Sequence, residues 1–86
     1  MKVRVRLFAS YREAAGGEWL EQVLPDGARV RDLLLALSRR PGLGSAAGRA
    51  LVARRMEYVA ADAALEEGDE VAVLPPLSGG REGRGA

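Results

Sequence analysis

Cysteine and histidine are both missing from this 86-residue chain. Without cysteine there is no disulfide, no thiolate nucleophile and no cysteine metal site. Without histidine the chain lacks the commonest general base and the commonest metal ligand. Any chemistry must therefore use carboxylates, hydroxyls, lysine, arginine or the chain termini. We therefore expect a carrier, a subunit or a binding module with no bound metal or cofactor, and no catalysis by this chain alone.

Long apolar runs and an excess of one charge are also missing. No segment approaches the ~20 apolar residues that span a bilayer, and the N-terminus opens on a patterned segment instead of a signal-peptide core. The net charge is +1 with both signs interspersed, which gives no electrostatic footprint for nucleic acid or an anionic membrane. These features predict a cytoplasmic protein that binds neither.

The first third of the sequence is typical of two strands. Residues 2–7 alternate strictly between polar and apolar side chains, which predicts a half-buried strand. We expect residues 10–15 to be a connector, Gly16 and Gly17 to supply a turn, and residues 18–24 to form a second strand that closes an N-terminal hairpin.

One helix and three further strands are expected after this hairpin. Val30, Leu33, Leu34 and Leu37 recur at i, i+3, i+4 and i+7, so residues 30–40 are predicted to be a helix with one apolar face. Residues 42–49 are expected to be a loop, and the remaining strands are expected at residues 50–53, 58–59 and 71–74. The order of the elements predicts an α+β fold with a sheet packed on one principal helix. We expect residues 1–76 to form the domain and residues 77–86 to be a flexible tail.

Several suggestive patterns have ordinary explanations. The glycines of residues 42–48 follow a helix and do not have the spacing of a dinucleotide-binding turn. The acidic residues 66–70 surround a glycine before a strand, where solvated charge is normal. The arginine pairs at residues 39–40 and 54–55 are not interleaved with aromatic side chains, so nucleic-acid binding is not indicated.

Of four large apolar residues, we expect three to lie on the surface and contact a partner and one to lie in the core. Phe8 is out of phase with the inward side of its strand, and we expect Phe8, Tyr58 and Leu74 to form a surface patch that binds a partner. Trp19 is expected to belong to the core.

The segment from Leu74 to Gly80 is unlike an ordinary frayed end. Pro75 and Pro76 hold the chain extended as it leaves the last strand, and Leu77 and Ser78 lead to Gly79 and Gly80, which carry no side chain. The six residues 75–80 reach roughly 20 Å when extended. This shape suits insertion of bare backbone into a narrow channel of another protein.

These motifs resemble those of the MoaD/ThiS family of ubiquitin-like sulfur carriers. Residues 68–80 (GDEVAVLPPLSGG) are similar to the closing motif of the family, and their two prolines favour the MoaD branch. Residues 7–13 (LFASYRE) resemble the family's first strand and the segment that follows it, and residues 30–34 (VRDLL) resemble its helix start. Residues 52–53 and 57–59 resemble its third-strand region. The resemblance runs in order over residues 1–80.

The resemblance implies a β-grasp fold and a role as the small subunit of molybdopterin synthase. Sulfur would be carried as a thiocarboxylate on Gly80, after an ATP-dependent, MoeB/ThiF-like enzyme adenylates that carboxyl group. The tail would then enter the large, MoaE-like subunit and give its sulfur to cyclic pyranopterin monophosphate. Residues 75–79 would be the inserted tail, with Phe8, Tyr58 and Leu74 packed on the partners and Arg12 adding a polar contact at the rim. ATP would be used by the partner enzyme only.

Two departures from the family pattern leave alternatives open. Arg54 and Arg55 stand where the family usually has an asparagine turn, and residues 81–86 follow the diglycine. The extension implies processing by a protease, a diverged relative that no longer carries sulfur, or a terminal addition. The alternative functions are sulfur delivery to thiamine thiazole or to tRNA, a ubiquitin-like protein modifier, and a plain interaction module.

Overall fold

The computed structural model describes residues 1–76, except for the side chains of residues 45 and 46. Its first strand, β1 (Lys2–Leu7), has the predicted bounds and separates the two faces of a sheet. Val3, Val5 and Leu7 are buried and the residues between them are exposed, because successive side chains of a strand point to opposite faces.

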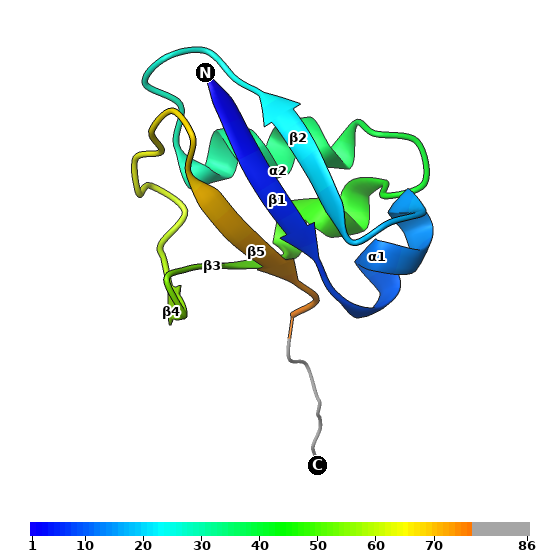
Figure 1. Cartoon of the computed structure of the whole chain (residues 1–86). Coiled ribbons are helices and arrows are strands. Elements are labelled where there is room, and N and C mark those ends of the chain that lie inside the picture. Colours follow the sequence, from blue (N-terminus) through cyan, green and yellow to red (C-terminus); the bar gives the residue numbers. More distant parts are fainter. Residues whose placement is uncertain (77–86) are drawn as a thin grey trace.

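Four more strands complete a mixed sheet. They are β2 (Trp19–Val23), β3 (Leu51–Arg54), β4 (Glu57–Tyr58) and β5 (Glu70–Leu74). The spatial order is β2-β1-β5-β3-β4, with β1 and β5 parallel and the other pairs antiparallel (Figure 1). Because β1 and β5 run in the same direction, the end of β1 lies beside the point where the chain leaves β5.

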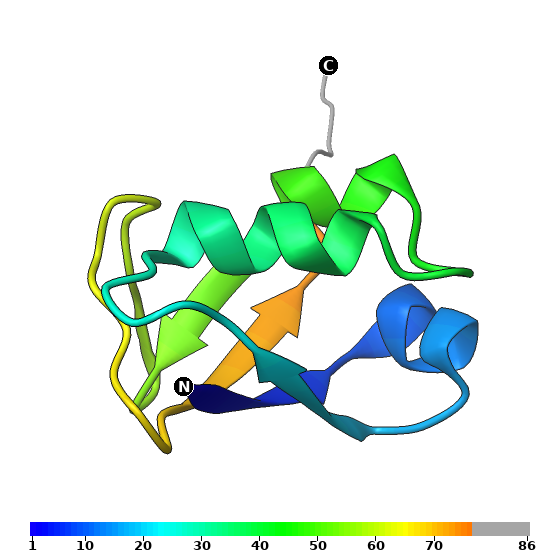
Figure 2. The same ribbon diagram turned by 90° about the horizontal axis from the view of Figure 1, so that it is seen from above.

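The predicted helix is α2 (Val30–Ser38), which covers one face of the sheet (Figure 2). All four of its predicted apolar positions are buried, as expected for an amphipathic helix on a sheet. The backbone N–H of Arg29 donates to Asp32 Oδ2 at 2.8 Å, which satisfies a donor at the helix N-terminus. The helix ends at Ser38, two residues earlier than predicted.

The expected connector at residues 10–15 is wrong, because a short helix, α1 (Ala9–Ala15), lies there. Only Tyr11 of this helix is buried, so the segment has no apolar repeat by which its sequence would predict a helix. Gly16 ends the helix in a left-handed conformation, with φ of 79° and its N–H donating to the carbonyl of Arg12 at 3.1 Å.

The expected loop at residues 42–49 contains a 3-10 helix, η1 (Ser45–Arg49), beside α2. Leu43 and Ala47 are buried in the core, so this segment closes the end of the helical layer. Gly42 has φ of 91°, and a Cβ at this position would lie 2.6 Å from the carbonyl oxygen of Ala14. Only glycine therefore fits where this segment passes α1.

Candidate functional site: an aromatic groove on the open face of the sheet

The face of the sheet opposite α2 carries one residue from each strand in a continuous row. The strand registers pair Trp19 with Arg6, Arg6 with Ala72, Ala72 with Ala53, and Ala53 with Tyr58. Paired residues of neighbouring strands lie side by side on the same face. The row therefore has two alanines at its centre and large side chains at its ends, which makes a hollow in this face.

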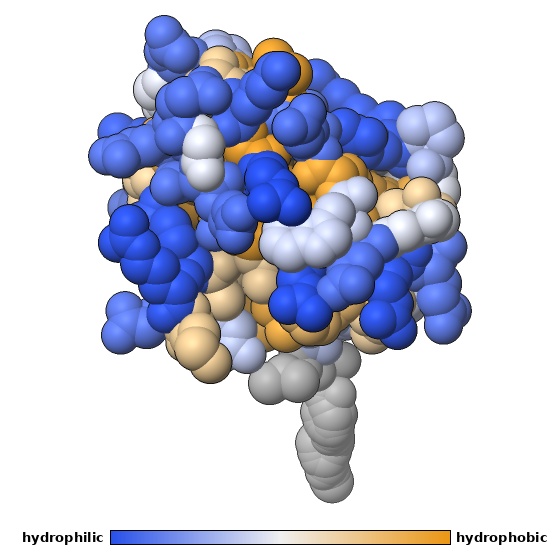
Figure 3. Space-filling model, viewed as in Figure 1, coloured by the Kyte–Doolittle hydropathy of each residue, from blue (hydrophilic) through white to orange (hydrophobic). Residues whose placement is uncertain are grey.

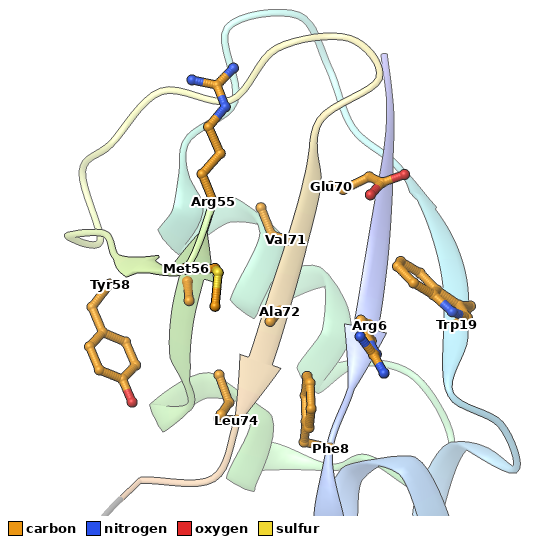
Figure 4. A pocket seen from close by; sticks show the side chains of 11 residues that line it. Arg6, Phe8, Trp19, Arg55, Met56, Tyr58, Glu70, Val71, Ala72 and Leu74 are labelled. Atoms are coloured by element: carbon orange, nitrogen blue, oxygen red, sulfur yellow. The ribbon is translucent and has the colours of Figure 1, made fainter.

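This hollow is an open groove of about 530 Å³, which we call the aromatic groove (Figure 4). Its lining residues are Arg6, Phe8, Trp19, Ala53, Arg55, Met56, Tyr58, Glu70, Val71, Ala72 and Leu74. Figure 3 shows that hydrophobic residues are exposed between hydrophilic ones on this side of the molecule.

The three residues predicted to form a partner surface lie together, since Phe8, Tyr58 and Leu74 all line the groove. Tyr58 is 63% exposed, and the other two are partly buried. Phe8 directly follows β1 and Leu74 ends β5, so the parallel pairing of these strands places both residues at the end where the chain leaves the sheet. Their role in partner binding stays a prediction.

The expectation that Trp19 belongs to the core is wrong, because its side chain is 43% exposed. Its cross-strand partner is Arg6, on the open face, whereas Leu20 is the residue of β2 that packs against the core. The guanidinium of Arg4 lies over the indole ring, 4.3 Å from its centroid, which is a cation–π contact. Trp19 is thus the outer wall of the groove.

Charges along this wall are paired with one another. Arg6 Nε donates to Glu18 Oε2 at 2.5 Å, and its guanidinium lies 5.1 Å from the ring centroid of Phe8. Arg4 Nη1 donates to Glu70 Oε2 at 2.7 Å. These side chains are about half exposed, so the pairs add little stability.

Arg12 lies on α1, is exposed and is not one of the groove-lining residues. Pro75 is partly buried and Pro76 is exposed as they continue from β5. Leu77, Ser78, Gly79 and Gly80, and the extension after them, lie outside the described residues, and their predicted roles stay predictions.

The sequence did not lead us to several lining residues, among them Arg6, Arg55, Met56 and the two floor alanines, Ala53 and Ala72. Arg6 could have been identified from its sequence position, because it occupies an outward-facing place in the alternation of β1. The hairpin then sets it directly across from Trp19. Among residues 1–76, no cluster of three or more acidic side chains has the arrangement of a metal site. No helix in that part of the chain has the length and apolar character needed to cross a bilayer.

The mixed sheet has β1 and β5 parallel at its centre and α2 packed across one face, which defines a ubiquitin-like, β-grasp protein. Its aromatic groove includes Leu74, the last residue of β5. The chain belongs to the ThiS family, whose match covers residues 5–80. It is 42% identical over 83 residues to the molybdopterin synthase sulfur carrier subunit of Chlamydomonas reinhardtii, a match that covers 93% of this chain and 100% of the relative.

Two solved structures are similar in fold and in sequence. SAMP1 from Haloferax volcanii has a TM-score of 0.73 and 30% identity, covering 93% of this chain and 100% of that protein. A complex of subunits 1 and 2 of the molybdopterin-converting factor from Helicobacter pylori contains a chain with a TM-score of 0.64 and 26% identity, covering 93% of this chain and 100% of that one.

Proposed function

We propose that this protein is the sulfur carrier subunit of a molybdopterin synthase. The observation that carries the proposal is the 42% identity to a sulfur carrier subunit over that relative's whole length. The family match ends at Gly80, the second glycine of the predicted carrier terminus. The aromatic groove supports the proposal because two of its lining residues, Phe8 and Leu74, lie at the end of the sheet where the chain leaves β5.

The chemistry is assigned to the carboxyl group of Gly80. A partner enzyme transfers AMP from ATP to this carboxylate and releases pyrophosphate, which makes the acyl carbon electrophilic. A sulfide equivalent then displaces AMP and leaves a thiocarboxylate. In the synthase the thiocarboxylate gives its sulfur to cyclic pyranopterin monophosphate, and water supplies the oxygen that returns the glycine to a carboxylate. Bare glycine suits both steps, since a Cβ would crowd the reacting carbon.

The protein's own part is to be held and presented by its partners. The groove offers aromatic and aliphatic side chains around a floor of alanines, which is the composition of a binding surface with anchor residues. We assign it to the large subunit, in keeping with the two-subunit complex that contains a similar chain. The adenylating enzyme is expected to use the same surface, because both partners must receive the same tail.

Residues 81–86 block this chemistry while they remain attached. The carbonyl of Gly80 is joined to Arg81 in a peptide bond, so no free carboxylate exists there for adenylation. We propose that a protease removes the extension after Gly80, as happens to ubiquitin-type precursors.

A protein modifier is the second candidate, favoured by the similarity to SAMP1, a small archaeal modifier protein. In that role Gly80 would be joined to lysines of other proteins. Lys2 is the single lysine of this chain and is exposed, so chains of linked copies through lysine would use Lys2 alone. Sulfur delivery to thiazole or to tRNA uses the same thiocarboxylate and differs only in the acceptor.

Intact-mass analysis of the protein isolated from its native cells separates these candidates. We expect a form that ends at Gly80 and carries the mass gain of one sulfur replacing one oxygen. A ladder of lysine conjugates without that form would favour the modifier, and a chain that always retains residues 81–86 with no added sulfur would refute both. For the acceptor, the thiocarboxylated protein is mixed with the large subunit and cyclic pyranopterin monophosphate. No sulfur transfer to the pterin would refute the synthase assignment.

A further inference from the structure

The hairpin between β3 and β4 has an unusual loop at the rim of the aromatic groove. Arg54 pairs with Glu57, so only Arg55 and Met56 lie in the loop. Both are left-handed, with φ of 55° and 67°. Two-residue loops of this kind favour Asn-Gly or Gly-Gly, because other residues are disfavoured at positive φ. Two long side chains at these positions work against folding, and strain of this kind is concentrated where a protein functions.

The two loop side chains make few contacts with the rest of the protein. Met56 is 99% exposed. Among the described residues Arg55 has no hydrogen-bond or ion-pair partner, and in Figure 4 its guanidinium lies apart from the other labelled side chains. Its neighbour Arg54 is the opposite case, since it donates to Asp69 Oδ2 at 3.1 Å and to the carbonyl of Ala64 at 3.0 Å. Within residues 1–76, neither loop side chain makes a hydrogen bond or an ion pair that would explain why these two residues stand in the loop.

Arg55 also carries the unmatched charge of the groove. Of the charged residues that line it, Arg6 is paired with Glu18 and Glu70 with Arg4. Arg55 has no such partner in the described part of the chain. A partner surface that covers the groove and extends past the loop would meet this guanidinium, and burying it there is costly unless a carboxylate pairs with it. The exposed thioether of Met56 fits an apolar socket of variable shape.

We propose that the Arg55–Met56 loop is a specificity element that selects the partner on the groove. Its counterpart is a carboxylate beside a shallow apolar socket on the surface of the large subunit. The proposal rests on the function proposed above and adds the part of the surface that distinguishes the cognate partner. The loop lies at the edge of the sheet, away from the tail, so it acts on recognition of the partner and leaves the chemistry of Gly80 unchanged.

Calorimetric titration of the full chain with the purified large subunit encoded by the same genome tests this. We expect Arg55→Glu to weaken binding by at least about tenfold, through like-charge repulsion at a buried contact. Arg55→Ala should weaken it less and should flatten the rise of Kd with sodium chloride. Arg31→Glu makes the same charge change at an exposed position of α2, on the other face of the sheet, and should leave Kd unchanged.

A double variant, Arg55→Asn with Met56→Gly, separates recognition from folding. It supplies the residues that a left-handed loop favours, so its melting temperature should rise while its affinity falls. The loop proposal is overturned if Arg55→Glu and the double variant both bind the large subunit with wild-type affinity. If Phe8→Ala then still loses affinity, the assignment of the groove to the large subunit stands without the loop. If neither the full wild-type chain nor the chain ending at Gly80 binds the large subunit, both the loop proposal and the synthase assignment fail.

Discussion

Three consecutive leucines of α2 provide a graded test of the fold. Leu33, Leu34 and Leu35 are 0%, 8% and 52% exposed, and all three lie inside the same helix. Replacing each with alanine changes intrinsic helix propensity by the same small amount. Differences among the three variants therefore report burial against the sheet.

The expected loss in the free energy of unfolding depends on the cavity that each truncated side chain leaves. Leu33→Ala opens a closed cavity between α2 and the sheet and should cost about 3–5 kcal/mol. Leu34 lies beside a shallow depression next to β3, where water can fill part of the space, so we expect about 2–3 kcal/mol there. Leu35→Ala should stay within about 0.5 kcal/mol, as surface substitutions do.

Urea unfolding measured by circular dichroism gives the three values. A small domain is stabilised by about 0.05–0.15 kcal/mol per residue, or about 4–11 kcal/mol over the 76 described residues. Leu33→Ala should therefore remove a large share of the stability and lower the melting temperature by well over about 10 °C. Equal losses in all three variants, or the largest loss at Leu35, would refute the placement of α2 on the sheet.

Three further outcomes are expected. Phe8→Ala should weaken binding of the large subunit by more than about 1 kcal/mol if Phe8 is an anchor of the groove. The control is Leu35→Ala, on the other face of the sheet. If calorimetry gives Phe8→Ala the same affinity as the wild type, Phe8 is not part of the interface. A chain ending at Gly80 should be adenylated by the cognate enzyme with labelled ATP, whereas the full chain should not; equal labelling of both would exclude the need for processing. Burial raises the pKa of Tyr11 above its usual value of 10.0, against a smaller lowering by Arg49, so the folded state holds the phenol proton more tightly than the unfolded state does. The resulting stability is complete below pH 10 and is lost as the pH rises through the raised pKa. The free energy of unfolding of the wild type should therefore fall more steeply above pH 10 than that of Tyr11→Phe. Parallel curves of unfolding free energy against pH would contradict this.

The sequence by itself determined the elements whose apolar residues recur at a regular spacing. The alternation of residues 2–7 predicted β1, and the i, i+3, i+4, i+7 spacing of Val30, Leu33, Leu34 and Leu37 predicted α2 and its buried face. The carrier family was also accessible from sequence, because its closing motif is local and includes the diglycine that the proposed chemistry needs.

The tertiary structure decided the features that depend on contacts between distant residues. Helix α1 forms around one buried side chain, Tyr11, so no periodic pattern marks it. Trp19 is exposed because its register with Arg6 places it on the open face, and a single strand's sequence does not say which of its two faces meets the core. The groove itself needs five strands in register, with Ala53 beside Ala72 at its floor. A hollow made by small residues between large ones on separate strands has no local signature, because it exists only once the sheet has assembled.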